Sequence, residues 1–356
     1  MGFVRRCFSL LLALLAIAGL NNCASTVNHV AYISMAGANQ IAGYQIKSAG
    51  QLSALQGSPF SGGSSPQGLL IHPSKQFLYV ANEGGGNISL FTIDSSTGAL
   101  TEASSRTTAG TEPSALAIDS AGKFLFAANI GSNDISVYSI DSASGALTPV
   151  AASPFPAGER PIAVSVSSNG FLYVANSNGG NVSAYSISSS NGELTEIKGS
   201  PYTVGTDPYS IAADPDGRFL YVANLESGSI SAFTINSASG ALAPVATYPA
   251  GTNPISVTVD TSGKYLYVAN SGSTNVSAFS IDSSSGALTQ ISGSPFAAGG
   301  TPIFAVVDAS DRFLYVGDQS SKIYGFSINS STGALSGTSG SPYSLSAAPS
   351  SMFTMH

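Results

Sequence analysis

The sequence predicts an all-β protein, a seven-bladed β-propeller with four antiparallel strands in each blade. Three observations carry this prediction: a six-residue phrase that recurs along the chain, a near-constant step between its copies, and complementary partial copies at the two chain ends. Units of 46–48 residues that each read as four short strands are typical of propeller blades. A β-solenoid is the alternative, but its coils are usually shorter.

The repeated phrase FLYVAN is expected to form the second strand of each blade. Its copies and close variants occupy residues 77–82, 124–129, 171–176, 219–224, 265–270 and 313–318, and a degenerate seventh copy occupies 29–35. Low charge and 39 glycines could suggest low complexity, but regular apolar alternation favours a folded chain.

The other strands follow from the residues around each copy. A short alternating run that begins with proline precedes the copy, and the prolines are Pro66, Pro113, Pro161, Pro208, Pro254, Pro302 and Pro349. A third strand such as 135–141 and a fourth opened by a segment such as 146–150 come after it. The links are rich in Gly, Asn, Asp and Ser, which tolerate tight turns, and the glycine of the STGAL-like turns suits a hairpin that needs a positive φ. No segment reads convincingly as an amphipathic helix.

The two chain ends predict how the ring closes. The first copy lacks its proline strand, whereas residues 349–355 supply a proline strand with nothing after it. Together they make one whole blade, so that residues 30–356 form a closed ring without an unpaired sheet edge. The proline strand is expected to be innermost, because its side positions hold small residues such as Ala115, Ala163 and Ser210.

The N-terminus reads as a targeting segment. Arg5 and Arg6 precede an apolar run over 8–20 that is too short for a comfortable membrane span, so residues 1–22 are expected to be a signal peptide. The segment before Cys23 resembles a bacterial lipoprotein signal. Lipidation would explain a lone cysteine in an exported chain, with 23–29 as a short linker. Ordinary secretion is the alternative. We expect a monomer in the periplasm or at the cell surface, held to the membrane only through the Cys23 lipid.

Charge and composition exclude several classes of partner. Without residues 1–22 the chain has 10 basic against 19 acidic residues, so nucleic acid and anionic membrane surfaces are poor partners. No histidine is placed as a buried base, and His72 falls in a column of turn residues on the face opposite the candidate site. With no cysteine cluster, neither a metal nor another cofactor is expected.

A candidate site is expected on the face formed by the links between blades and the links after FLYVAN, because these loops vary most between copies. Its candidate binding residues are Asn82, Arg160, Asp207, Asn224, Glu226 and Asp318. The alternative for the asparagine column, which we favour, is that each side chain caps its own turn. Few basic residues lie on this face, which disfavours a phosphorylated ligand.

The FLYVAN units and the segments after them resemble YVTN-type repeats and the lactonase family of seven-bladed propellers, typified by bacterial 6-phosphogluconolactonase and carboxymuconate cyclising enzymes. The family's enzymes carry Pro-Arg-His, then His-Pro, then Tyr-x-x-Asn-Glu. The matching positions here are Pro66, His72-Pro73, Tyr79, Asn82 and Glu83. Gln67 and Gly68 stand where the resemblance places the arginine and the histidine, so the anion clamp and the acid/base group that it implies are missing.

Two functions follow. The first is a non-catalytic binding or scaffolding module at the cell envelope, with a protein or a glycan as its partner. The second is a lactone hydrolase with a reorganised site around Asn82, Glu83 and Arg160, in which Glu83 acts as a base on water against a small lactone. The missing arginine and histidine favour the first. A pocket that brings carboxylates and Arg160 together would favour the second.

Overall fold

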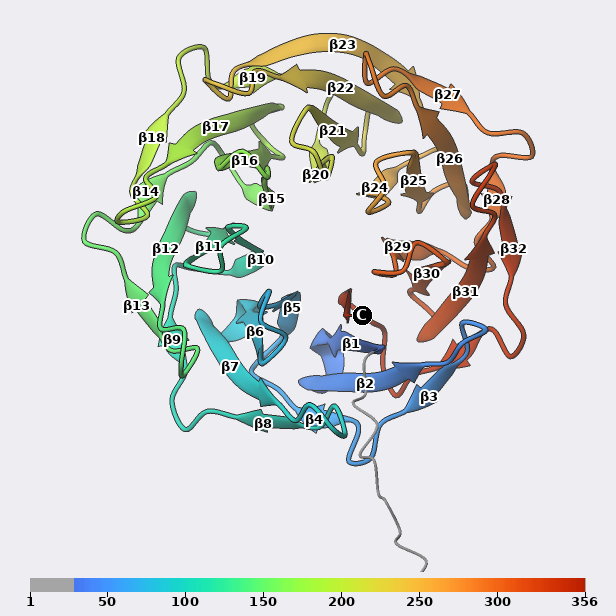
Figure 1. Ribbon diagram of the computed structural model, residues 1–356, viewed down its shortest axis with the longest axis horizontal. Coiled ribbons are helices and arrows are strands. Elements are labelled where there is room, and N and C mark those ends of the chain that lie inside the picture. Colours follow the sequence, from blue (N-terminus) through green and yellow to red (C-terminus); the bar gives the residue numbers. More distant parts are fainter. Residues whose placement is uncertain (1–28, 356) are drawn as a thin grey trace, which may run out of the picture.

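A computed structural model describes residues 29–355 and confirms the predicted ring (Figure 1). Seven antiparallel sheets surround a central axis, and in each the four main strands follow one another from the axis outward. The expected signal peptide over 1–22 and the candidate lipidation site Cys23 lie outside the described residues. Within residues 29–355 no helix is long and apolar enough to cross a membrane.

The inner two strands of each blade lie where the prolines and the FLYVAN copies predict them. The innermost strands are β5 (Pro66–Ile71), β10 (Pro113–Ile118), β15 (Pro161–Val166), β20 (Pro208–Ala213), β24 (Pro254–Val259), β29 (Pro302–Val307) and β34 (Ser351–Met355). The second strands are β1 (Val30–Met35), β6 (Phe77–Asn82), β11 (Phe124–Asn129), β16 (Phe171–Asn176), β21 (Phe219–Asn224), β25 (Tyr265–Asn270) and β30 (Phe313–Asp318).

The outer strands complete each blade. The third strands are β2 (Gln40–Ile46), β7 (Asn87–Ile93), β12 (Asp134–Ile140), β17 (Asn181–Ile187), β22 (Ser229–Ile235), β26 (Asn275–Ile281) and β31 (Lys322–Ile328). The fourth strands are β3 (Leu52–Ala54), β8 (Leu100–Glu102), β13 (Leu147–Pro149), β18 (Leu194–Glu196), β23 (Leu242–Pro249), β27 (Leu288–Gln290) and β32 (Leu335–Gly337). Helical structure within 29–355 is limited to two three-residue 3-10 turns, η1 (Ala36–Ala38) and η2 (Glu83–Gly85).

Six blades carry a further two-residue strand that the sequence did not predict. These strands pair with the third strand of their blade and are β4 (Phe60–Ser61), β9 (Thr107–Thr108), β14 (Phe155–Pro156), β19 (Tyr202–Thr203), β28 (Phe296–Ala297) and β33 (Tyr343–Ser344). In the remaining blade the longer β23 spans both positions, as its unbroken arc in Figure 1 shows. The outer edge is therefore one interrupted strand in six blades and one continuous strand in the seventh.

The ring closes through the two chain ends, as predicted. The last strand β34 pairs antiparallel with β1, from Val30 opposite Met355 to Ser34 opposite Ser351. The first blade therefore takes its innermost strand from the C-terminus and its other three strands from the N-terminus. This pairing leaves no inner strand edge open.

Buried tyrosines latch neighbouring blades together. In six of the seven second strands the third residue is a tyrosine whose hydroxyl donates to a glycine carbonyl of the next blade, at 2.7–3.0 Å. The tyrosine and glycine pairs are Tyr32–Gly98, Tyr79–Gly145, Tyr173–Gly240, Tyr221–Gly286, Tyr267–Gly333 and Tyr315–Gly50. The last pair joins the seventh blade to the first. Phe126 takes the tyrosine's place in the third blade.

The accepting glycines are required by both conformation and packing. Gly145 has φ 72°, a left-handed conformation that disfavours other residues. A Cβ at Gly145 would lie 2.7 Å from the Phe77 ring of the preceding blade. The prediction that these turns need a positive φ is confirmed.

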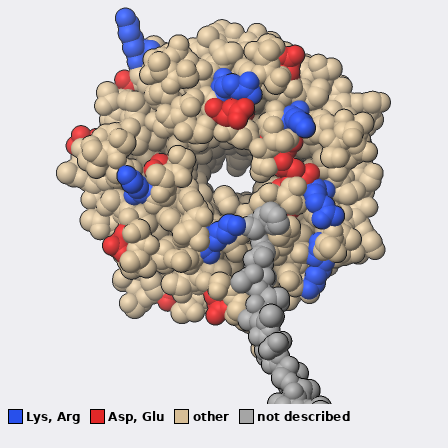
Figure 2. Space-filling model, in the orientation of Figure 1, with Lys and Arg blue, Asp and Glu red and all other residues tan. Residues whose placement is uncertain are grey.

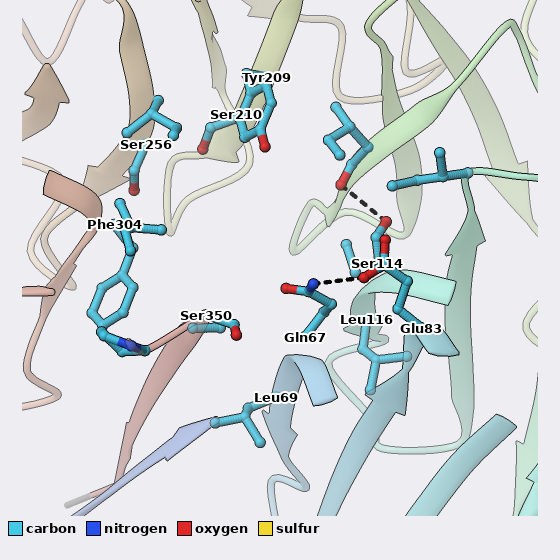
Figure 3. A pocket seen from close by; sticks show the side chains of 18 of the residues that line it. Gln67, Leu69, Glu83, Ser114, Leu116, Tyr209, Ser210, Ser256, Phe304 and Ser350 are labelled. Carbon is cyan, nitrogen blue, oxygen red and sulfur yellow. Dashed lines mark hydrogen bonds between the residues drawn. The ribbon is translucent and has the colours of Figure 1, made fainter. Parts of the chain in front are cut away.

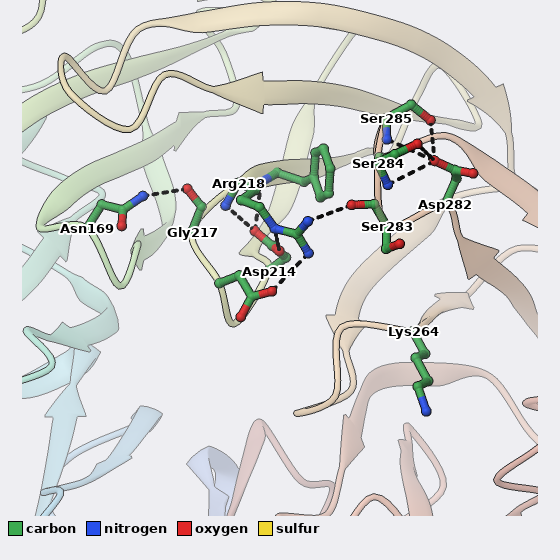
Figure 4. A network of polar contacts seen from close by, with 12 residues as sticks. Asn169, Asp214, Gly217, Arg218, Lys264, Asp282, Ser283, Ser284 and Ser285 are labelled. Atoms are coloured by element: carbon green, nitrogen blue, oxygen red, sulfur yellow. Dashed lines mark hydrogen bonds and ion pairs between the residues drawn. The ribbon is translucent and has the colours of Figure 1, made fainter.

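On the face opposite the candidate site, polar contacts also join blades (Figure 4). Asp214 accepts hydrogen bonds from the backbone of Arg218 and Phe219, both at 2.6 Å. The Arg218 guanidinium bonds Asp216 and reaches the carbonyl of Ser283 in the next blade (Figure 4). On this face, therefore, charged side chains connect the turns of neighbouring blades.

Candidate functional site

A β-bulge at the start of the innermost strands turns side chains toward the mouth of the axis. In the fifth blade Pro208 pairs with Asn224 and Ser210 pairs with Ala223, so Tyr209 has no cross-strand partner. The second blade has a wider break, in which Pro66 and Leu69 are paired and both Gln67 and Gly68 are skipped. Bulges re-aim side chains in this way at barrel rims and active sites.

These bulges surround a cavity of about 450 Å³ at the mouth of the axis. Its polar lining includes Gln67, Glu83, Arg160 and Tyr209, which come from the second, fourth and fifth blades. Figure 2 shows the opening at the centre of the ring and the sparse, scattered charges on the face opposite this cavity. A cavity of this volume is of the size that holds a small molecule.

Glu83 opens η2 directly after the buried strand β6 and is half-buried. Its Oε2 atom accepts a hydrogen bond from Gln67 Nε2 at 2.7 Å, as Figure 3 shows, and a longer one from Ser65 Oγ at 3.4 Å. Oε1 has no hydrogen-bond partner among residues 29–355. The carboxylate is therefore fixed through one oxygen and open through the other.

Arg160 and Tyr209 supply unengaged donors at the same cavity. Arg160 precedes Pro161 with φ 56°, and its backbone N–H bonds Asn133 Oδ1 at 2.8 Å. Neither the Arg160 guanidinium nor the Tyr209 hydroxyl has a hydrogen-bond partner in the part of the chain that the structure describes. Both groups can therefore donate to a ligand.

The electrostatic environment keeps Tyr209 protonated. Burial raises the pKa of the Tyr209 hydroxyl above its ordinary value; the Arg160 charge lowers this pKa, and Asp207 and Glu83 raise it. At neutral pH the hydroxyl is thus a neutral hydrogen-bond donor and not a base.

The Gly68 position leaves no room for a side chain. A Cβ there would lie 2.7 Å from the carbonyl oxygen of Ser114 and 3.1 Å from the Cα of Ala115 on the neighbouring inner strand. A histidine at this position would require the two strands to move apart. The packing of the second and third blades therefore does not accommodate the histidine that the family motif has at this position.

The serine hydroxyls at the mouth mostly serve the scaffold. Ser114 Oγ donates to the Ile162 carbonyl at 3.3 Å, Ser210 Oγ accepts from the Val257 N–H at 3.0 Å, and Ser256 Oγ accepts from the Ala305 N–H at 3.1 Å. Each contact ties one inner strand to the next. The polar side chains at the cavity that remain for a ligand are therefore those of Gln67, Glu83, Arg160 and Tyr209.

Three of the other candidate residues are buried. Asn82 and Asn224 are fully buried, and Asn82 Nδ2 donates to Asn87 and Ser89 at 2.9 Å each. Asn224 Nδ2 donates to Ser231 Oγ at 3.0 Å, and its Oδ1 accepts from the Gly205 N–H at 3.2 Å. The buried Asp318 accepts from the backbone of its own turn, at Ser320 and Lys322. These side chains hold turns and do not line the axial cavity.

The last two candidates lie at the edge of the site. Asp207 is half-buried beside Tyr209, and its carbonyl accepts from the Leu225 N–H at 2.8 Å. Glu226 is exposed and does not line the cavity. The sequence analysis placed Glu83 and Arg160 in one site, and the structure brings them to one cavity. The sequence analysis missed Tyr209. The available signal was its position directly after the proline of an inner strand, which is the position that Gln67 has in the second blade.

The cavity is lined by no histidine, and the described residues contain no cluster of metal-ligating side chains. His72 is buried at a turn on the opposite face, with Nε2 2.9 Å from the Gly122 carbonyl and Nδ1 2.8 Å from Ser74 Oγ. Residues 29–355 contain no group of three or more His, Cys, Asp and Glu side chains that could hold a metal ion.

The chain is a seven-bladed propeller with a cavity at the mouth of its axis. The sequence model of the family described as Lactonase, 7-bladed beta-propeller, matches residues 24–112, 103–207, 202–306 and 259–347. Because these matches cover most of the chain, the chain belongs to this lactonase family. No curated protein sequence matches it.

Solved structures share the architecture at low identity. A candidate 6-phosphogluconolactonase from Bacteroides uniformis superposes with a TM-score of 0.81 at 18% identity, over 92% of this chain and 99% of that one. A candidate 6-phosphogluconolactonase from Bacteroides fragilis gives 0.80 at 21%, over 93% and 98%. A periplasmic gluconolactonase from Pseudomonas aeruginosa gives 0.79 at 20%, over 92% and 99%. At these identities the likeness shows the fold alone.

Proposed function

We propose that the chain is an exported lactone hydrolase with a reorganised site at the mouth of its axis. The observation that carries the proposal is the meeting of one half-free carboxylate, Glu83, with two unengaged donors, Arg160 and Tyr209, in a single cavity. Membership of the lactonase family supports the same reaction class.

The chemistry needs only water and the lactone. Glu83 Oε1 takes a proton from a water molecule, whose oxygen attacks the lactone carbonyl carbon. Tyr209 O–H and the Arg160 guanidinium donate to the oxyanion that forms. When the tetrahedral intermediate collapses, the ring C–O bond breaks and the leaving oxygen takes the proton from Glu83. The product is the open hydroxy acid.

A second function, binding without turnover, is supported by the departure of this chain from the family motif. Gln67 and Gly68 replace the arginine and histidine that the family's enzymes carry, and Gly68 has no space for a replacement side chain. In this case the same cavity, or the variable face around it, would hold a glycan or a protein of the cell envelope.

Proton release from a panel of lactones distinguishes the two functions. Residues 24–356, made without the signal segment, are expected to hydrolyse at least one lactone above background. Glu83→Gln is expected to lower that rate about 100-fold or more, because a positioned base contributes at least this factor. Glu226→Gln, at an exposed site outside the cavity, is the matched control and should keep the wild-type rate. Absence of turnover across the panel would favour the binding function.

The geometry of the chain ends supports a location for the site relative to an anchor. Val30 and Met355 are paired at the face opposite Glu83, since β1 and β34 both span the blade from one face to the other. A lipid on Cys23 would be at most about 20 Å of extended chain from His29. The proposed anchor thus directs the cavity away from the membrane.

Lipid labelling tests the anchor independently of catalysis. Cells that express the full chain are expected to incorporate labelled fatty acid into the protein, and Cys23→Ser should abolish the label and release the protein from the membrane fraction. Label that persists in Cys23→Ser would contradict the anchor, and an unlabelled wild-type protein would favour ordinary secretion.

A further inference from the structure

The wall of the axial cavity carries both polar and apolar side chains, and one stretch of it is apolar over two neighbouring blades. At the mouth, the residues that directly follow the column proline in the first three blades are Ser350, Gln67 and Ser114. The fourth and fifth blades hold Ile162 and Tyr209 at this position, and the adjacent sixth and seventh blades hold Ile255 and Ile303. Figure 3 shows Gln67 and Glu83 on one side of the cavity and Ser256 and Phe304 on the other. Phe304, with Ile255 and Ile303 on the same two inner strands, therefore lies across the cavity from the Glu83 carboxylate, whereas the rest of the apolar lining is spread around the cavity: Leu69, Leu116, Ile130 and Ile162.

The seventh blade departs from the repeat in a way that enlarges this apolar stretch. Phe304 stands where the other inner strands carry Gly68, Ala115, Ala163, Ser210, Ser256 and Ser351. Opposite it, Gly317 replaces the alanine of the FLYVAN phrase, and the two residues are paired between β29 and β30. A Cβ at Gly317 would lie 2.4 Å from the end of the Phe304 ring. The two departures from the repeat fit each other, because the missing side chain at Gly317 leaves the space that the Phe304 ring occupies.

Charge at the cavity points to an unphosphorylated ligand. Arg160 is the one cationic side chain that lines the cavity among residues 29–355, and the Glu83 carboxylate lines it as well. Recognition of a phosphate group favours several converging donors of positive charge. The cavity instead offers one cation, one carboxylate and the apolar side chains of Ile255, Ile303 and Phe304.

We infer that the ligand of this cavity is an amphipathic lactone, an uncharged cyclic ester with an apolar substituent. The inference rests on the proposed function for the position of the ester, which lies beside Glu83, Gln67 and Tyr209. The apolar substituent then lies against Ile255, Ile303 and Phe304. A cavity of about 450 Å³ holds a five-membered lactone ring with a short alkyl chain.

A chain-length series tests the inference. The substrates are γ-butyrolactone, γ-hexalactone, γ-octalactone and γ-decalactone, with glucono-δ-lactone and its 6-phosphate for comparison. We expect kcat/KM to rise about two- to fourfold per buried methylene until the wall is filled, since each such group stabilises binding by the corresponding transfer free energy. The phosphorylated lactone is expected to be the poorest substrate.

Binding is measured separately, so that a failure of catalysis does not hide the ligand preference. Calorimetric affinities for 3-alkyl cyclopentanones, in which a methylene replaces the ring oxygen of the γ-alkyl lactones and which cannot be hydrolysed, should rise with chain length in the same way. Such a rise without turnover of any lactone would keep the inference and overturn the proposed hydrolysis. Turnover that is independent of chain length, or fastest with the phosphorylated lactone, would overturn the inference and keep the hydrolysis.

Variants locate the apolar stretch of the wall. Phe304→Ser, which restores the residue of the fifth and sixth blades, is expected to remove most of the chain-length dependence, whereas Phe304→Leu keeps it. Ile303 is half-buried at the cavity and depends less on packing with Gly317, so Ile303→Ser gives a second test if Phe304→Ser does not fold. An unchanged chain-length dependence in a folded Phe304→Ser or Ile303→Ser variant would contradict the assignment of the wall.

Discussion

The closing latch of the ring offers a direct test of how the blades are held together. The Tyr315 hydroxyl donates to the Gly50 carbonyl at 2.8 Å and joins the seventh blade to the first. Both residues are buried, and the Gly50 carbonyl accepts no other hydrogen bond from residues 29–355. Tyr315→Phe removes the hydroxyl, keeps the ring and leaves a buried acceptor without its partner.

The magnitude follows from the cost of that lost partner. A buried acceptor that loses its hydrogen bond destabilises the fold by about 1–3 kcal/mol. The removed hydroxyl also leaves a small void, which adds to the cost. We therefore expect Tyr315→Phe to lower the free energy of unfolding by about 2 kcal/mol. Tyr324→Phe is the matched control, because its hydroxyl bonds an exposed glycine carbonyl, that of Gly299, at 3.0 Å. Water can replace that bond, so about 0.5 kcal/mol or less is expected.

Urea unfolding followed by circular dichroism and by tyrosine fluorescence measures both variants. The midpoint should move for Tyr315→Phe with an unchanged slope, since a change confined to stability leaves the exposed surface area the same. Equal losses in the two variants, or no loss in Tyr315→Phe, would refute the view that the buried latches hold neighbouring blades.

Three further outcomes follow from the structure. Tyr209→Phe is expected to lower the rate of lactone hydrolysis about 100-fold with little change in the unfolding midpoint, because it removes one oxyanion donor that has no partner in the scaffold; an unchanged rate in a steady-state assay would exclude that role. Gly145→Ala is expected to cost about 2–4 kcal/mol in urea unfolding, because its φ of 72° and its contact with Phe77 both oppose a Cβ, whereas Gly337→Ala, with nothing within 4 Å, should change stability by about 0.5 kcal/mol or less. Burial raises the pKa of the latch tyrosines, so the stability that they contribute is fully present below about pH 10, the pKa of an unfolded tyrosine, and is lost as the pH rises above it; an unfolding midpoint that stays constant from pH 9 to about pH 12 would contradict this.

The ring could be predicted from the sequence because the repeated phrase shows directly where each blade begins and how long it is. The prolines and the FLYVAN copies marked the inner strands, and the incomplete units at the two ends predicted the pairing of β34 with β1. The short strands such as β14 (Phe155–Pro156) were not predicted, because two residues carry too little alternation to distinguish a strand from a loop.

The candidate site was predictable only in part. Glu83 follows a family motif and Arg160 is a rare cation on the variable face, so both could be singled out, and both line the cavity. Tyr209 reaches the cavity through a bulge, which is a property of strand register that a single sequence does not reveal.

The structural role of the asparagines that end the FLYVAN copies could have been predicted from the residues that follow them in the sequence. Each asparagine is followed five residues later by Asn, Asp or Ser and seven residues later by Ser, as in Asn82, Asn87 and Ser89. In the structure the Asn82 amide donates to both of these side chains. A polar residue that recurs together with hydrogen-bond partners five and seven residues later is thus expected to hold its own turn and not to face a ligand.

The central claim is that this cavity hydrolyses a lactone with water activated by Glu83. Mass spectrometry of the product formed from γ-octalactone in water enriched in oxygen-18 tests it most directly, with the wild-type chain, Glu83→Gln and a protein-free control in parallel. We predict one heavy oxygen in the product carboxylate, formed by the wild-type chain well above the protein-free rate and by Glu83→Gln close to that rate. Product formation by the wild-type chain no faster than in the protein-free control, or equally fast by Glu83→Gln, would contradict the claim.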